Sequence, residues 1–551
     1  MRQNEWTGTI GNNPLLWKIL FFSVLVAYCL CYAPFGINET DGGFITGLAW
    51  QVLNGKPLYR EILYVRPLFP VWLRALELQV LPENWAVLGE RWIFYLKVGL
   101  YSWLGAAILT GGAQRWMLST FGFVVSVHCY PPMAWHTVDG ILCSVLGIWF
   151  LVKTPSVWNV GLGAVFMFAA LLCKQSFYPM AAVLAGLLFF GQNFPKVDNF
   201  RKIAPGLLAF LFCIILFFSY LSSNGALENY LRLTGGPASG GQALQHGVLD
   251  YFRIKPALAL WSAVLLAPVV WHFWKRKNAE IAYWGWDFWL SLLACTYAFS
   301  VWSREEFGVP FSQARLLFWA GVLFAIFLKK EDNTLKFSLK IQNLNPPLLA
   351  LLAVSWCASV SWGYNLPILF STPWVFAIMV ITRHLWQQAY PGRDHRWHSF
   401  VALLGLLVLF RLSYEFVYRD GRRSEMNAHL GDVFPQLSGI YSTSEKKKLY
   451  LDLKSLAARY PNFKTLPAFP QANFLTKTRP PFPLDWVVNR ETNGDNTLIM
   501  NNIKENRPVL LIEKSWLGKI PSDPELTLTR DLLRSGTVLD ETPHFLIVKP
   551  E

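Results

Sequence analysis

Charged residues are scarce in this chain, and their scarcity excludes an ordinary soluble protein. Asp, Glu, Lys and Arg make up 15% of the 551 residues, whereas hydrophobic residues make up 53%. Soluble domains carry about 25% charged residues. A disordered chain is excluded for another reason, because such chains are poor in aromatic residues and this one contains 16%. The apolar residues form runs long enough to cross a bilayer, so the composition predicts a membrane protein.

Cysteine is also sparse, and its placement gives no sign of a metal site or a disulfide framework. All the cysteines lie in or beside apolar segments, which favours a packing role. They are residues 29, 31, 129, 143, 173, 213, 295 and 357.

The net charge of +14 does not indicate nucleic-acid binding. The basic residues lie mainly in short clusters between apolar runs, where they set the orientation of a membrane protein. We therefore expect membrane lipid, and no nucleic acid, among the partners of the chain.

Windows of about twenty residues predict a bundle of about thirteen transmembrane helices. The windows are 16–34, 91–110, 117–131, 137–152, 155–173, 176–190, 203–221, 255–274, 284–302, 313–328, 346–362, 366–382 and 398–413.

Lys and Arg are concentrated in alternate loops between these windows, which predicts that the N-terminus is cytoplasmic. The odd number of spans then places the C-terminus outside, in an inner membrane of bacterial type. We expect a transmembrane domain over residues 1–413 and an outer domain over 414–551. The residues that carry this pattern are Lys196, Arg201, Lys202, Lys275, Arg276, Lys277, Lys329, Lys330, Lys336, Lys340, Arg383, Arg393 and Arg396.

Two outer loops are too long to be simple connectors. Residues 35–90 contain amphipathic stretches at Gly43–Leu53 and Pro70–Val80, which predict helices along the membrane surface. Residues 222–254 are rich in glycine and predict a mobile loop or lid. We expect these two loops to carry the chemistry.

The composition changes after the last span, which predicts a soluble mixed α/β domain. A helical pattern covers Ser444–Tyr460, and strand-like apolar runs follow at Val509–Ile512 and Phe545–Val548. The domain contains neither a Gly-x-Gly-x-x-Gly pattern nor a phosphate-loop pattern, so we do not expect a nucleotide site there.

The first outer loop combines an acid, a surface helix and a turn that ends in Tyr-Arg-acid. The segments are Asp41–Phe44, Leu53–Glu61 and Arg66–Pro70. This arrangement resembles the first external loop of the GT-C superfamily of polytopic glycosyltransferases, particularly the branch of protein O-mannosyltransferases and lipid A aminoarabinose transferases. Those enzymes show an Asp-Glu-Gly-like start followed by Gly-x-x-Pro-Tyr-Arg-Asp. Here Gly42 replaces the second acid and Glu61 replaces the last Asp.

The resemblance implies an inverting membrane transferase that takes a sugar from a polyprenyl-phosphate donor on the outer face. It implies that Asp41 is the catalytic acid of the loop. Weaker matches to the family lie at Lys174-Gln175 and at Ser361–Tyr364.

Such a transfer needs a general base for the acceptor hydroxyl and cations for the departing phosphate. Asp41 is the candidate base, although an Asp before an amphipathic run is also a common helix cap. Glu39 is a possible supporting acid or a solvated loop charge. The candidates for binding the donor phosphate are Arg60, Arg66, Lys174, Arg304 and Arg315. The alternative is that these side chains snorkel to the membrane interface or pair with Glu61, Glu305 or Glu306.

His136 and Asp139 are spaced to share one helical face at the start of a span. Two groups cannot complete a metal shell, and helix capping by Thr137 or Asp139 explains them as well. We therefore predict no metal and no cofactor. Possible contacts to donor or acceptor are Glu61, His136, Asp139, Gln175 and Tyr364.

The sequence thus predicts a glycosyltransferase that moves one sugar from a polyprenyl-phosphate carrier to an envelope glycan or lipid. A protein O-mannosyltransferase of the same fold is the nearest alternative. A lipid-linked sugar flippase or transporter is the alternative from another class, although it should show midplane charges and internal repeats. A non-catalytic assembly protein on the same scaffold would tolerate loss of Asp41.

Overall fold

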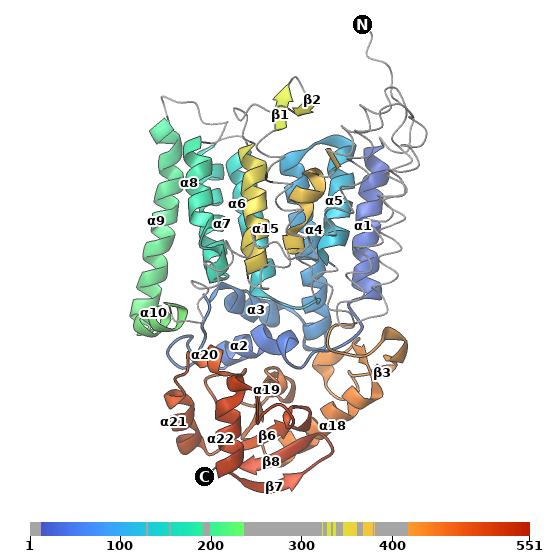
Figure 1. Ribbon diagram of the computed structural model, residues 1–551, viewed down its shortest axis with the longest axis vertical. Helices are drawn as coiled ribbons and strands as arrows, with labels where there is room; N and C mark the ends of the chain where they lie inside the picture. Colours follow the sequence, from blue (N-terminus) through green and yellow to red (C-terminus); the bar gives the residue numbers. More distant parts are fainter. Residues whose placement is uncertain are drawn as a thin grey trace, which may run out of the picture.

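The chain forms a bundle of helices, and residues 417–550, here called the C-terminal domain, lie beneath one end of it (Figure 1). The computed structural model describes residues 13–127, 131–153, 156–190, 199–235, 322, 328–331, 334–337, 345–360, 367–377, 379–380 and 417–550.

The predicted spans that fall on described residues coincide with helices. Three of these helices, α1, α4 (extended by η3) and α9, are long and apolar enough to cross a membrane, which fits a helical membrane protein. The predicted spans 255–274, 284–302 and 398–413 lie outside the described residues, and 313–328 and 366–382 are described only in part. The helices are α1 (Pro14–Cys31), α4 (Ala86–Leu109), α5 (Gly112–Val127), α6 (His136–Val152), α7 (Val157–Leu171), α8 (Met180–Phe190), α9 (Asn199–Ser223) and α15 (Pro346–Val360).

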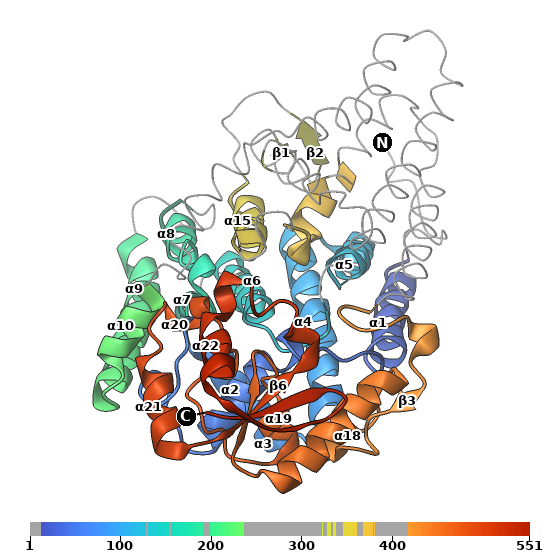
Figure 2. The ribbon, with the colours of Figure 1, turned by 60° about the horizontal axis from the view of Figure 1, so that its bottom comes forward.

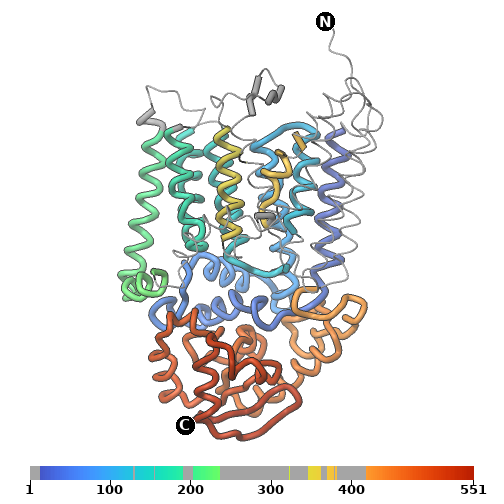
Figure 3. The backbone as a smooth tube through the Cα atoms, viewed as in Figure 1, coloured from blue at the N-terminus to red at the C-terminus, as the bar shows by residue number. Residues whose placement is uncertain are grey.

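The first loop forms a layer between the bundle and the C-terminal domain (Figure 3). Its main helices are α2 (Phe44–Leu53) and α3 (Phe69–Val80). The short helix η2 (Asp41–Gly43) precedes α2, and the short helix η3 (Glu83–Trp85) follows α3. Both predicted helices are confirmed. Most of α2 is buried, so it packs beneath protein rather than lying open on a membrane surface.

Only residues 222–235 of the predicted glycine-rich loop are described. They include α10 (Leu227–Gly235), a helix that follows α9 at the same end of the bundle as the C-terminal domain (Figure 1).

Residues 417–550 form a mixed arrangement of strands and helices, seen from below in Figure 2. A four-stranded sheet has the order β5-β6-β8-β7, with β5 and β6 parallel and the other neighbours antiparallel. The predicted helix at Ser444–Tyr460 and the predicted strands at Val509–Ile512 and Phe545–Val548 are confirmed. The strands are β3 (Ala428–His429), β4 (Tyr441–Ser442), β5 (Phe463–Leu466), β6 (Val509–Glu513), β7 (Thr537–Glu541) and β8 (Phe545–Lys549), and the helices are η6 (Arg423–Glu425), η7 (Pro435–Leu437), α18 (Ser444–Arg459), α19 (Ala472–Thr476), α20 (Asn489–Thr492), α21 (Thr497–Asn506), η8 (Lys514–Trp516), η9 (Pro524–Leu526) and α22 (Thr527–Ser535).

The two ends of the bundle carry different parts of the chain. The start of α1 and the hairpin of β1 (Leu328–Glu331) and β2 (Thr334–Phe337) lie at one end, and the C-terminal domain lies at the other (Figure 1). Which end faces the outside stays a prediction.

A buried ionic network joins the loop layer to the bundle. The Arg74 guanidinium lies 2.5 Å from the Glu90 carboxylate, and the Lys97 ammonium lies 3.0 Å from Glu77 and 2.7 Å from Asp139. These residues come from α3, α4 and α6. Charges in a poorly solvated position need such partners, so the network fixes the positions of the three helices relative to one another.

The C-terminal domain packs so closely on α2 that no side chain fits at Gly47. A Cβ there would lie 2.5 Å from the Pro470 carbonyl oxygen and 2.9 Å from Asp485 Oδ2. We expect Gly47→Ala to destabilise this contact by about 1–3 kcal/mol, the usual cost of overpacking. The measurement is thermal unfolding in detergent combined with limited proteolysis of the C-terminal domain.

The matched control for this prediction is Gly161→Ala in α7, where an added Cβ meets no atom within 4 Å. If Gly47→Ala and Gly161→Ala unfold and are cleaved alike, the close contact between α2 and the C-terminal domain is wrong.

Candidate functional site

Side-chain hydrogen bonds hold the segment that carries Asp41. Arg91 of α4 donates to the carbonyl oxygens of Ala33 at 2.7 Å and Gly36 at 2.5 Å. Asn38 Oδ1 then accepts from the backbone N–H groups of Thr40 at 2.9 Å and Asp41 at 3.2 Å. Buried backbone groups need such partners, and these contacts fix the direction in which the chain enters η2.

Asp41 is 6% exposed, and its carboxylate contacts two residues that follow the last predicted span. The Tyr418 hydroxyl donates to Asp41 Oδ2 at 2.9 Å, and the Arg419 guanidinium lies 3.2 Å from the same oxygen. The carboxylate does not cap a helix, because no side chain caps η2 or α2. The structure therefore favours an ionic role for Asp41 over the capping alternative.

Glu39 is a second buried acid on this segment. One of its oxygens pairs with the Lys446 ammonium of α18, whereas Oε1 has no hydrogen-bond partner. Burial raises the pKa of Glu39 to about 7, although the Lys446 charge acts in the opposite direction. Burial and the Lys446 charge thus act on the Glu39 carboxyl in opposite directions.

Arg66 joins the first loop to the C-terminal domain. Both of its terminal nitrogens lie 2.7 Å from the carboxylate oxygens of Glu491 in α20, in a bidentate pair whose side chains are 16% and 0% exposed. The guanidinium also lies over the Phe44 ring, 5.2 Å from its centroid. Glu491 therefore occupies the fork of the guanidinium.

Lys174 lies in the turn between α7 and η4 (Gln175–Phe177), next to Arg66. The side chain of its neighbour Gln175 donates to the Val65 carbonyl oxygen at 2.5 Å, which ties this turn to the first loop. The Lys174 ammonium has no hydrogen-bond or ion-pair partner among the residues that the structure describes. Burial and the charge of Arg66 lower the pKa of Lys174.

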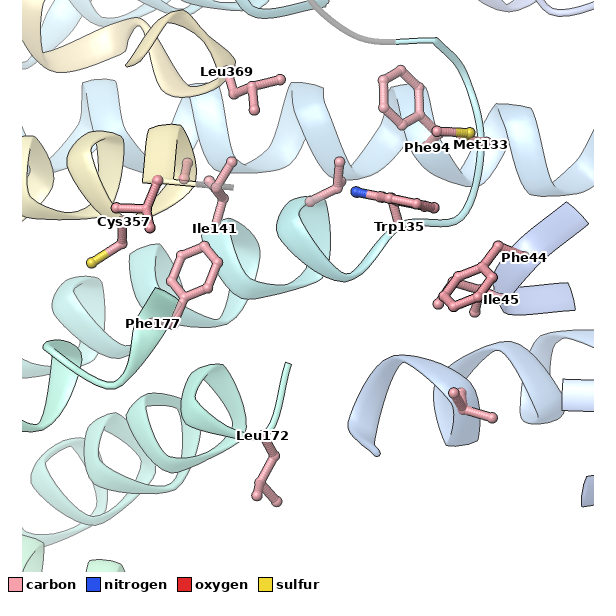
Figure 4. Packing of buried hydrophobic residues seen from close by; sticks show 14 of the residues in the cluster. Phe44, Ile45, Phe94, Met133, Trp135, Ile141, Leu172, Phe177, Cys357 and Leu369 are labelled. Carbon is pink, nitrogen blue, oxygen red and sulfur yellow. The ribbon is translucent and has the colours of Figure 1, made fainter. Parts of the chain in front are cut away.

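An aromatic cluster lies beside Arg66, whose guanidinium contacts the Phe44 ring. The Phe44 ring lies 5.9 Å from Trp135 and 5.1 Å from Trp486, and Trp135 lies 4.4 Å from the His136 ring. Figure 4 shows Phe44 of α2 and Trp135 near the start of α6 within the buried cluster. Lys174 and Arg66 are close enough for their charges to act on His136, and the charge of Asp41 acts on Arg66.

The structure thus brings Asp41, Arg66, Lys174, Gln175 and His136 into one region. It pairs Arg60 instead with its neighbour Glu61 at 2.9 Å, and these side chains are 56% and 47% exposed. Asp139 belongs to the ionic network of α3, α4 and α6, where it pairs with Lys97, and it does not cap α6. Arg304, Arg315 and Tyr364 lie outside the described residues.

Sequence reasoning missed the partners that the C-terminal part supplies. Tyr418, Arg419, Lys446 and Glu491 contact Asp41, Glu39 and Arg66 from positions 377 to 425 residues away. No local pattern marks them. Glu491, for example, lies in a helix of only four residues, and its burial is visible only in the structure.

Comparison with known proteins gives a likeness in structure alone. No protein-family model matches the chain, and no curated protein matches it. The chain is similar to ArnT from Cupriavidus metallidurans in the apo state, with 13% identity, 97% of each chain covered and a TM-score of 0.42.

The chain is also similar to the oligosaccharyltransferase AglB from Archaeoglobus fulgidus in complex with an inhibitory peptide and a dolichol-phosphate, with 11% identity, 96% of this chain and 73% of that one covered and a TM-score of 0.42. The apo oligosaccharyltransferase of the same organism gives 10% identity, coverages of 98% and 74%, and a TM-score of 0.37. At these identities and TM-scores the likeness carries no inference about individual residues or substrates. The neighbours are glycosyltransferases of the GT-C superfamily, which the first outer loop of this chain resembles.

Proposed function

We propose that this protein is a membrane glycosyltransferase that moves one sugar from a polyprenyl-phosphate donor to an acceptor. The observation that carries the proposal is the Lys174 ammonium, which has no partner among the described residues and lies near the Arg66 guanidinium, in the region that also holds the buried Asp41. A phosphate would supply the negative charge that Lys174 lacks there.

The reaction uses the two kinds of group in different roles. The Asp41 carboxylate takes the proton of the acceptor hydroxyl as the hydroxyl oxygen bonds to the anomeric carbon. The bond from that carbon to the phosphate oxygen breaks, and the phosphate leaves with the electron pair. Lys174 binds the phosphate directly, and Arg66 adds its charge while it remains paired with Glu491. A single displacement of this kind inverts the anomeric centre.

The proposal places residues 1–413 in the cytoplasmic membrane of a bacterial cell as the catalytic part and residues 414–551 outside it. The acceptor would be an envelope glycan or lipid. We propose no metal or cofactor for these steps, in which Lys174 and Arg66 supply the positive charge for the leaving phosphate.

The test is transfer of labelled sugar from a panel of polyprenyl-phosphate sugars to membrane extracts by the purified protein. We expect Lys174→Gln to lower the rate by about 10²–10³-fold, the usual cost of losing one group that stabilises developing charge. The control is Lys448→Gln, because Lys448 is exposed on α18 and should leave the rate unchanged.

The product decides between acceptors, because label in protein would favour a protein O-mannosyltransferase. Equal rates for wild type and Lys174→Gln would remove Lys174 from the site. If no donor gives transfer while lipid-linked sugar still crosses the membrane, the protein is a flippase and the proposal is wrong.

A further inference from the structure

Two buried ring side chains near Lys174 have polar atoms without partners, and so does Ser176, two residues along the chain from Lys174. The Tyr64 hydroxyl and His136 Nδ1 make no hydrogen bond within the described structure, and these residues are 0% and 1% exposed. A buried polar atom without a partner costs about 1–3 kcal/mol. Such atoms are rare in native structures, and a bound ligand is one way to satisfy them.

Ring contacts and hydrogen bonds place the two atoms around the same aromatic cluster. Tyr64 lies 6.2 Å from the Phe44 ring, and His136 reaches that ring through Trp135. The contact from Gln175 to the Val65 carbonyl oxygen holds the turn of Lys174 beside the segment of Tyr64. The two unpartnered atoms and the ammonium therefore come from three segments that meet in one place.

The chemical types of these groups differ from those of a phosphate site. A phenol hydroxyl both donates and accepts hydrogen bonds, and a neutral imidazole nitrogen donates or accepts according to its tautomer. Either group can pair with the hydroxyl groups of a sugar. The Phe44 and Trp135 rings add apolar faces against which the C–H groups of a sugar ring can pack. The cation beside them suits the phosphate to which that sugar is joined.

We propose that Tyr64 and His136 form the binding site for the sugar ring of the donor, next to the phosphate that Lys174 binds. This inference rests on the proposed function and adds the residues that recognise the sugar. It predicts that the two residues distinguish a sugar-bearing lipid phosphate from the bare lipid phosphate.

The test measures binding to the full-length protein in nanodiscs through its tryptophan fluorescence. The ligands are farnesyl phosphate and farnesyl phosphate that carries a mannosyl or an arabinosyl group. We expect Tyr64→Phe and His136→Phe each to weaken binding of a sugar-bearing ligand by about 3–10-fold, as the loss of one hydrogen bond does. Their affinity for farnesyl phosphate should equal that of wild type, whereas Lys174→Gln should weaken binding of every ligand.

Stability provides an independent readout. Tyr64→Phe removes a hydroxyl that has no partner, so we expect it to leave the melting temperature unchanged or to raise it. The matched control is Tyr450→Phe in the C-terminal domain, because the Tyr450 hydroxyl accepts a hydrogen bond from Gln471 at 3.0 Å. That variant should lower the melting temperature and leave all binding constants unchanged.

Several outcomes would overturn the inference. Equal weakening for bare and sugar-bearing ligands would make Tyr64 and His136 phosphate ligands, and no weakening for either would make them structural residues. If wild type binds farnesyl phosphate but gains nothing from the sugar, the inference fails and the phosphate role of Lys174 stands. If wild type binds none of the ligands, the proposed function fails together with the inference.

Discussion

Asp41→Asn is expected to lower the rate of sugar transfer by about 10²–10⁴-fold, which is the usual contribution of a general base. Asn has nearly the same shape as Asp and keeps an oxygen that can accept from Tyr418, so the local fold should survive. What the variant loses is the negative charge that faces Arg419 and that can take a proton. The loss should therefore appear in the rate at saturating donor, with little change in melting temperature.

The control for this variant is Asp452→Asn on α18. Asp452 is an acid of the C-terminal domain that pairs with His544 at 2.7 Å, outside the region of Asp41. It should keep the wild-type rate. If Asp41→Asn also keeps that rate, Asp41 is not the base, and Glu39→Gln becomes the next variant to assay.

The helices were predictable because their signal is local. The apolar runs at 16–34 and 203–221 lie within four residues of the ends of α1 and α9. A bilayer requires about twenty consecutive apolar residues, and such a run is visible without knowledge of any neighbour. The same holds for α18. A cap residue, Thr443, marks where this helix begins, and its apolar residues recur with the period of a helix.

The partners of the site residues were not predictable, because each depends on a contact across the fold. Arg66 looked equally suited to a phosphate and to Glu61, yet the structure gives it Glu491, which is 425 residues away. Asp41 was the candidate base with a helix cap as the alternative, and its contact with Tyr418 is visible only in the structure. Arg74 and Lys97 drew no attention, since the contacts of Arg74 with Glu90 and of Lys97 with Glu77 and Asp139 run between different helices.

The pair of Arg66 and Glu491 should contribute more to stability than any exposed ion pair of the chain. Glu491 is fully buried, so Arg66→Met would leave its carboxylate without a partner in a poorly solvated position. We expect a loss of about 3–5 kcal/mol for Arg66→Met, and a comparable loss for Glu491→Gln, which leaves the guanidinium unpaired. The double variant should lose much less than the sum, because it has no uncompensated charge. Chemical unfolding in detergent measures all three.

The chain contains a matched pair for comparison. Arg232 of α10 and Asp495 also join the membrane part to the C-terminal domain at 2.7 Å, but their side chains are 53% and 45% exposed. Water solvates both charges there, so breaking this pair should cost less than about 1 kcal/mol. Because Arg66 also supplies charge to the proposed phosphate site, its removal should slow transfer, whereas Arg232→Met should not. Equal losses of stability for the two pairs would mean that Arg66 and Glu491 are solvated, and that the C-terminal domain does not close over the first loop.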